Sequence, residues 1–180
     1  GQNWDNKDNY VHIRRIEILS DDKKYSEGVF ASLVKLSENQ DPHKCPVKIN
    51  SYCFDYSYFY LLDAEINAST FNHENSWFQI ELSSGSAVLT GFRLKKYRLN
   101  VLKNFKIICT DDVNKSEELW TQLIEINEKT EDEHYLLDIY NFPHPSPPTR
   151  FIRLIQTGPN WENNYFLTFL HLDFFGCYFY

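Results

Sequence analysis

The segment Phe166-Leu-Thr-Phe-Leu-His-Leu-Asp-Phe-Phe175 is a run of ten mostly apolar residues near the C-terminus. Its side chains alternate in the way that favours a β-strand over a helix. The run has about half of the roughly 20 residues that a membrane-spanning helix requires. We therefore expect a buried strand, with His171 as a packed or rim side chain of that strand.

Shorter segments of the same kind fill most of the chain before this run, with turn residues between them. Strands are expected at Val11–Leu19, Val47–Ser51, Ser76–Leu82, Ala87–Tyr97, Asn104–Thr110, Trp120–Ile126, Tyr135–Tyr140 and Arg150–Thr157. Only Ser26–Leu36 has helical spacing, and it predicts one or two turns of helix. A series of short strands separated by turns, without intervening helices, is typical of an antiparallel sandwich or barrel.

Three polar segments interrupt the strand pattern. Asp111–Glu118 and Asn127–His134 are acidic and are expected to be solvated hairpin tips. Asn141–Pro148 contains four prolines, which exclude a central strand and predict a stiff crossover. Arg150 and Arg153 flank apolar residues, and we expect both to pair with carboxylates at the sheet edge.

Within the predicted strand Ser76–Leu82, we expect the large apolar side chains to face the core and the polar ones to face solvent. Trp77, Ile80 and Leu82 are expected to face the core, while Gln79 and Glu81 face outward.

The segment Tyr52–Tyr60, YCFDYSYFY, contains six aromatic rings in nine residues. Its rings also alternate, so one side of such a strand would be a ladder of aromatic side chains. Five buried rings would make up a large part of a core, but buried tyrosine hydroxyls need hydrogen-bond partners. Core packing and a contact surface both remain open interpretations.

Composition and motifs narrow the function. A chain of 180 residues with 42% hydrophobic and 24% charged residues is typical of one folded domain. The net charge of −7 argues against nucleic-acid binding and against a cationic membrane patch. The sequence contains none of the common hydrolase, nucleotide-binding or zinc motifs, and its histidines lack ligand spacing. These features predict a non-catalytic binding protein without a cofactor.

Acidic pairs are the one feature that points to a metal. Asp111-Asp112 and Glu117-Glu118 could hold calcium through loop oxygens, but they lack the spacing of a known calcium loop. We interpret them as solvated loop residues.

Five segments in order resemble one family, the discoidin or coagulation-factor 5/8 type C domain, which is galactose-binding-like. They are Asn75–Leu82, Val88–Leu94, Leu102–Asp112 with Trp120 and Leu123 after it, Thr149–Leu154 and Phe166–Cys177. The resemblance implies an antiparallel jelly-roll β-sandwich over residues 45–180, with residues 1–44 as a strand and helix extension packed on it. Two further segments, Tyr25–Leu33 and Arg153–Trp161, are similar to discoidin copies in protist BTB-type proteins. The chain lacks Met and begins with Gly, so we expect it to be a processed product or a fragment of a longer protein.

The same resemblance implies a ligand face of three loops at one end of the sandwich. By order along the chain these loops are Tyr52–Tyr60, Lys95–Leu102 and Gly158–Tyr165. Our candidate contact residues are Tyr56, Tyr58, Phe59, Tyr60, Tyr97, Arg98, Asn160 and Trp161.

The four cysteines bear on the compartment. In secreted family members a disulfide ties the ends of the domain, and Cys45 and Cys177 stand where those cysteines would be. A Cys45–Cys177 bridge would place the protein outside the cell, and free thiols would place it in the cytoplasm, which the charge and the protist-like segments favour. Cys53 and Cys109 are expected to be small apolar core residues.

The sequence thus predicts a recognition module that binds a protein partner within a larger intracellular scaffold or adaptor. The alternative is a carbohydrate-binding or cell-surface adhesion module, in which a sugar stacks on Trp161 beside Asn160, Asn163 and Asn164. The tyrosine-rich loop and the acidic charge disfavour lipid binding, despite Lys95, Lys96, Arg98 and Lys103.

Overall fold

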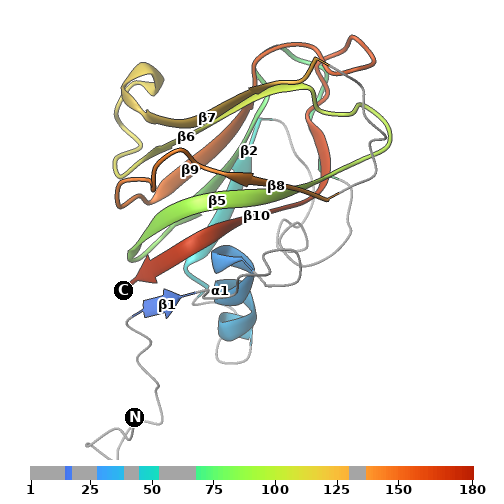
Figure 1. The fold of residues 1–180 in the computed structure, drawn as a ribbon. Coiled ribbons are helices and arrows are strands. Elements are labelled where there is room, and N and C mark those ends of the chain that lie inside the picture. The colour runs from blue at the N-terminus through green and yellow to red at the C-terminus, as the bar shows by residue number, and fades with distance from the viewer. Residues whose placement is uncertain (1–14, 18–27, 39–44, 53–67, 130–136) are drawn as a thin grey trace, which may run out of the picture.

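Two antiparallel sheets pack face to face in the computed structural model, which describes residues 15–17, 28–38, 45–52, 68–129 and 137–180 (Figure 1). Sheet 1 has the strand order β1-β10-β5-β8, with β3 also paired to β10, and sheet 2 has the order β2-β4-β9-β6-β7. The strands of sheet 1 are β1 (Arg15–Glu17), β3 (Ala68–Ser69), β5 (Ser86–Lys96), β8 (Leu137–Asn141) and β10 (Thr168–Phe179). Those of sheet 2 are β2 (Val47–Ser51), β4 (Trp77–Leu82), β6 (Asn104–Thr110), β7 (Thr121–Asn127) and β9 (Phe151–Gln156). This is the jelly-roll β-sandwich that the sequence predicts.

Two described helical segments accompany the sheets. The α-helix α1 covers Val29–Glu38, where the sequence predicts a helix, and the 3-10 helix η2 covers Glu117–Leu119. None of the helices that the structure describes is both long enough and apolar enough to cross a membrane.

The connections between the sheets confirm one sequence prediction and correct another. The proline-rich segment Asn141–Pro148 leads from β8 in sheet 1 to β9 in sheet 2, so it is the expected crossover. Asn127–His134 was expected to be a hairpin tip, but β7 and β8 lie in different sheets, so this segment also belongs to a crossover. Residues 130–136 lie outside the described residues.

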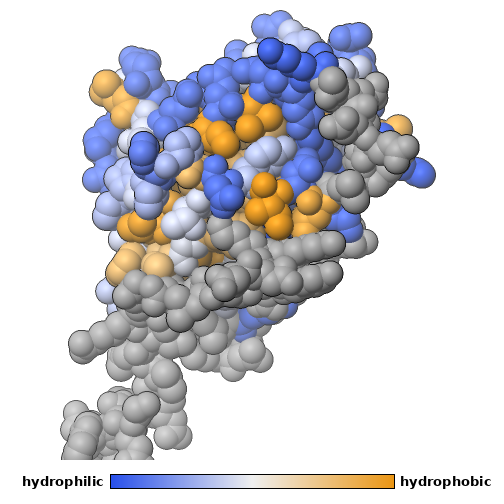
Figure 2. Space-filling view, in the orientation of Figure 1, coloured by the Kyte–Doolittle hydropathy of each residue, from blue (hydrophilic) through white to orange (hydrophobic). Residues whose placement is uncertain are grey.

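The core lies between the sheets and is rich in aromatic rings. Phe92 of sheet 1 is stacked on Tyr140, with 4.7 Å between ring centroids, and meets Phe105 of sheet 2 edge-on at 6.3 Å. Phe78 of β4 and Phe169 of β10 join the sheets by a second edge-on contact, at 5.1 Å. In the space-filling view, apolar side chains gather in the middle of the visible face, over the region of β5 and β8, with hydrophilic side chains around them (Figure 2).

Trp77 lies on the outer face of sheet 2, contrary to the sequence prediction. Phe78, Ile80 and Leu82 are the β4 residues in the main core, so Trp77 and Gln79 point to the other side. Strict alternation places Trp77 opposite to Ile80, because three positions separate them. A second cluster on that outer face contains Trp77, Ile108, Trp120, Phe151 and Ile155.

Arg153 organises this outer cluster. Its guanidinium carbon lies 4.6 Å from the Trp77 ring centroid and 4.5 Å from that of Trp120. Its nitrogens donate to Gln79 Oε1 at 2.7 and 3.0 Å and to Glu117 Oε2 at 2.9 Å. The predicted carboxylate pairing is therefore confirmed for Arg153, whereas Arg150 donates to the backbone carbonyl of Leu82.

Helix α1 covers the edge of β10 that lies between its short partners β1 and β3 (Figure 1). The helix begins after Gly28, which has no side chain that could accept hydrogen bonds from the backbone N–H groups of the first turn. The buried carboxylate of Asp173 in β10 accepts such a bond instead. The Phe30 N–H donates to Asp173 Oδ1 at 3.3 Å, and Arg93 Nη2 lies 3.8 Å from Oδ2. A Cβ on Gly28 would overlap the Asp173 carboxylate. Burial of Val29, Phe30, Leu33 and Val34 makes the helix part of the main core.

Substitution Gly28→Ala is expected to destabilise the fold by about 1–3 kcal/mol, because the methyl group overpacks the contact with Asp173. Chemical denaturation followed by circular dichroism measures the change. Ser32→Ala, in the same helix at a half-buried position, is the control and is expected to be nearly neutral. Equal midpoints for the two variants would contradict the proposed fit of Gly28 against Asp173.

Stability is also expected to fall with rising pH through Asp173. Desolvation raises the pKa of the Asp173 carboxyl to about 7, although the N–H of Phe174, the charge of Arg93 and the N–H of Phe30 lower it. The unfolded value is roughly 4, so between pH 4 and 7 the folded state keeps a proton that the unfolded state has released. The free energy of unfolding therefore declines as pH rises through this window. Between pH 5.5 and 8, the free energy of unfolding of the wild type should fall by about 2 kcal/mol more than that of the Asp173→Asn variant. Parallel pH profiles for the two proteins would show instead that Asp173 stays ionised.

Candidate functional site

The strand register brings several connections to one end of the sandwich. Ser51 pairs with Phe78, Trp77 with Ile155, and Phe105 with Gln156. The start of β10 likewise lies beside the end of β5. The described residues at this end are Tyr52 and the segments 70–76, 97–103 and 157–167, which we call the loop end. In Figure 1 the connections after β5 and after β9 both lie at the right-hand end of the molecule.

Segments 97–103 and 157–167 are joined by hydrogen bonds from both backbones. The Trp161 N–H donates to the Val101 carbonyl at 3.1 Å, and the Val101 N–H donates to Glu162 Oε2 at 3.0 Å. The Asn164 side-chain amide donates to Asn100 Oδ1 at 2.8 Å. The structure therefore brings together the second and third loops that the family resemblance implies.

Segment 70–76 joins the same surface. The Tyr165 N–H donates to Asn72 Oδ1 at 2.7 Å, and the Leu167 N–H donates to Thr70 Oγ1 at 3.0 Å. The ring of His73 lies 4.9 Å from that of Tyr52, measured between centroids. Three stretches that are distant in sequence thus form one surface.

Asn160 is buried at 1% exposure and organises the third loop from within. Its Oδ1 accepts from the N–H groups of Glu162 and Asn164, both at 3.1 Å. Its Nδ2 donates to Asn164 Oδ1 and, at 3.3 Å, to the Phe166 carbonyl. The amide is fully used inside the protein, so Asn160 shapes the loop rather than offering atoms to a ligand.

Trp161 is the aromatic ring that the third loop brings to this surface. The ring is half-buried, and the Lys103 ammonium lies 4.3 Å from its centroid. Lys103 comes from the neighbouring loop, so the cation–π contact joins the two loops. Of the other predicted contact residues, Tyr97 is half-buried and Arg98 is exposed, while Tyr56, Tyr58, Phe59 and Tyr60 lie outside the described residues.

The sequence reasoning missed the contribution of segment 70–76. Phe71 is 66% exposed, and Leu99 in segment 97–103 is 54% exposed. His73 and Tyr165 also lie at this end. The aromatic and polar run Phe71-Asn-His-Glu-Asn75, directly before the predicted strand Ser76–Leu82, was the signal available in the sequence.

Lys96 was expected to add basic charge near this end, but it is 5% exposed and neutralised. Its ammonium pairs with Glu128 and, at 3.0 Å, with Asp138. The hydroxyl of Tyr140 donates to the same two carboxylates at 3.3 Å. Burial raises the pKa of Tyr140, so its hydroxyl stays protonated. This cluster joins β5 and β8 to Glu128, the residue that follows β7.

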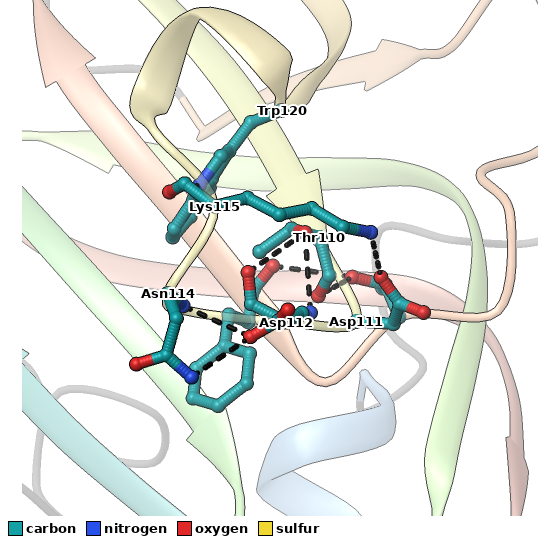
Figure 3. Close-up of polar contacts among 8 residues, drawn as sticks. Thr110, Asp111, Asp112, Asn114, Lys115 and Trp120 are labelled. Atoms are coloured by element: carbon teal, nitrogen blue, oxygen red, sulfur yellow. Dashed lines mark hydrogen bonds and ion pairs between the residues drawn. The ribbon is translucent and has the colours of Figure 1, made fainter.

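The acidic β6–β7 hairpin lies at the opposite end of the sandwich (Figure 1), and Figure 3 shows its polar contacts. Asp112 Oδ1 accepts from the backbone and side-chain nitrogens of Asn114, both at 3.0 Å, and Asp111 pairs with Lys115 at 2.7 Å. The Trp120 indole N–H donates to the Lys115 carbonyl at 3.1 Å. These carboxylates are used within the hairpin, and the described residues contain no group of three or more metal-binding side chains.

Cys45, Cys109 and Cys177, the cysteines that the structure describes, are thiols, and the Cys45–Cys177 bridge stays a prediction. Cys45 is half-buried beside the main core, and Cys177 lies in β10 opposite Val88. Cys109 is buried in the core as predicted, and burial raises the pKa of its thiol to about 11. Cys53 lies outside the described residues. The redox state in the natural compartment stays a prediction.

Solved structures share this fold at low sequence identity. SusE-like protein BT2857 superposes with a TM-score of 0.59 and 16% identity, over 74% of this chain and 65% of that chain. CpGH89CBM32-5 from Clostridium perfringens, in complex with GalNAc-β-1,3-galactose, superposes with a TM-score of 0.55 and 14% identity, over 72% of this chain and 94% of that chain. An F5/8 type C domain from Bacteroides fragilis superposes with a TM-score of 0.54 and 13% identity, over 71% of this chain and 89% of that chain.

The matched region thus spans less than two thirds of the length of BT2857 and nearly all of the C. perfringens module. No protein-family model matches the chain, and no curated protein sequence does. The fold is that of the discoidin-like domains, as the sequence resemblance implies. The narrower resemblance to protist BTB-type proteins stays a prediction.

Substitution Asn160→Asp tests the role of this amide in the loop. A carboxylate can still accept from the N–H groups of Glu162 and Asn164, but it cannot donate to Asn164 Oδ1 and the Phe166 carbonyl. We expect a loss of about 1–3 kcal/mol in unfolding free energy, with NMR shift changes concentrated in residues 157–167. Asn163→Asp, at an exposed position of the same loop, is the matched control. An Asn160→Asp variant as stable as the control would contradict the organising role.

Proposed function

We propose that this domain is a non-catalytic carbohydrate-binding module that holds a saccharide at the loop end. The observation that carries the proposal is the half-buried Trp161, which lies on a surface joined from three chain segments, in two hydrogen-bonded loops that also carry the Asn100 and Asn164 amides. A sugar offers both an apolar ring face and a rim of hydroxyl groups. An aromatic ring beside amides can stack on the first and hydrogen-bond to the second.

The solved structures with this fold support a saccharide over the protein partner that the sequence analysis preferred. The C. perfringens module described above is named as a complex with GalNAc-β-1,3-galactose. Another neighbour of the same family is named as a complex with galactose. Because a shared fold does not fix a function, these complexes support the proposal only together with the loop-end geometry. A saccharide ligand also favours an extracellular or cell-surface location over the cytoplasm.

A protein partner is the second candidate for the same surface. Phe71 and Leu99 are large apolar side chains with 66% and 54% exposure at the loop end. Exposed apolar side chains on a shared surface are typical of protein contacts. This candidate rests on Phe71 and Leu99, whereas the saccharide proposal rests on Trp161.

Binding of the purified domain to a broad glycan array tests the proposal. We expect at least one class of saccharide to bind, and Trp161→Ala should weaken that binding roughly tenfold or more, since the stacking surface is removed. The control is Tyr180→Ala, which removes a 79% exposed ring outside the loop end and should leave binding unchanged. Circular dichroism verifies that both variants are folded.

An array without any ligand would contradict the saccharide proposal and favour the protein partner. In that case, Phe71 and Leu99 would become the first positions to test.

A further inference from the structure

Two lysines near the loop end have opposite environments. Lys96 is buried between the carboxylates of Glu128 and Asp138, so its charge is compensated inside the protein. Lys103 instead places its ammonium over the Trp161 ring, at 4.3 Å from the centroid. In the part of the chain that the structure describes, no carboxylate forms an ion pair with Lys103.

Two acidic residues near this contact direct their carboxylates to other partners. Glu162, next to Trp161, accepts the Val101 N–H through Oε2 at 3.0 Å. Glu128, whose backbone N–H donates to the Lys103 carbonyl, directs its carboxylate to Lys96 and Tyr140. Arg98, on the same connection as Lys103, is exposed and pairs with no carboxylate among the described residues. Lys103 and Arg98 therefore have no carboxylate partner among the described residues, while the loop end also carries the exposed carboxylates of Glu74 and Glu162.

We propose that the loop end selects acidic saccharides, those that carry a uronic acid or sialic acid residue, and that Lys103 is the residue that determines this specificity. This inference rests on the proposed function, because it names the class of saccharide that the same surface takes.

The position of Lys103 against the ring gives the physical reason. A sugar that stacks beside Trp161 would bring one of its substituents close to the Lys103 ammonium. A carboxylate there forms a charge-assisted hydrogen bond, which is roughly twice as strong as the bond that a hydroxyl forms. The contact with Trp161 and the backbone bonds between the two loops hold the ammonium in place, so little side-chain freedom is lost on binding.

A purely structural role for Lys103 makes a different prediction. If the lysine only covered the indole ring and joined the loops, its replacement would weaken the binding of neutral and acidic saccharides equally. The decisive quantity is therefore the ratio of the affinity for the acidic saccharide to the affinity for the neutral one. A change in the loop conformation alone would leave this ratio unaltered.

The experiment uses an array with matched neutral and acidic saccharides, such as galactosides beside galacturonides and lactose beside sialyllactose. Calorimetric titration of the best-bound pair then compares the wild type with Lys103→Gln and Lys103→Arg. Lys48→Gln, at an exposed lysine on β2, is the control for the change in net charge.

We expect the wild type to bind the acidic member roughly fivefold to tenfold more tightly than the neutral member. Lys103→Gln should bring this ratio close to 1, while Lys103→Arg and Lys48→Gln keep it. Added salt should weaken the binding of the acidic member more than the binding of the neutral one.

Two results would overturn the inference, and they are distinguishable. A wild type that binds both members equally, or a ratio that Lys103→Gln does not change, would refute the role of Lys103 and leave the proposed function standing. Failure of every saccharide to bind would refute both.

Discussion

Pairing between β10 and β5 is the interaction on which most of the structure depends. The ladder runs from Phe169 opposite Lys96 to Phe179 opposite Ser86, with irregularities that let the long strands bend. Gly176 takes a φ of 148° at one of them, where a side chain would meet the Val88 carbonyl. Because opposite residues share a face, this register places Phe174 beside Phe92 in the core and Asp173 beside Arg93 on the outer face.

Both the N-terminal elements and the loop end follow from this ladder. On one edge of β10, Asp173 receives the first turn of α1, and β1 and β3 pair on either side of the helix. At the start of β10, the ladder fixes the ends of segments 97–103 and 157–167 next to each other. Buried side chains such as Asn160 then complete the loops. A rigid sandwich thus carries a surface whose chemistry is set by few residues, which is how one fold can serve many ligands.

The contrast between Lys96 and Lys103 shows why a count of charges predicts little about a site. The residue type is the same and the positions are seven apart, yet one ammonium is enclosed by two carboxylates and the other lies over an indole ring. A buried charge needs compensation, so Lys96 serves the fold. The described chain offers Lys103 no such compensation, which makes it the better candidate for contact with an anion.

The sequence by itself predicted the described strands other than β3, the helix at Val29–Glu38, and the crossover Asn141–Pro148, because alternation, helical spacing and prolines act locally. Together with the family resemblance it also gave the sandwich and two of the loops at the candidate site. Only the tertiary structure decided that Arg153 lies against the Trp77 ring, that Asn160 is buried, and that Phe71 joins the loop end. These outcomes depend on contacts between residues up to about a hundred positions apart, as for Thr70 and Leu167. Such contacts are set by sheet register and packing, which no local pattern encodes.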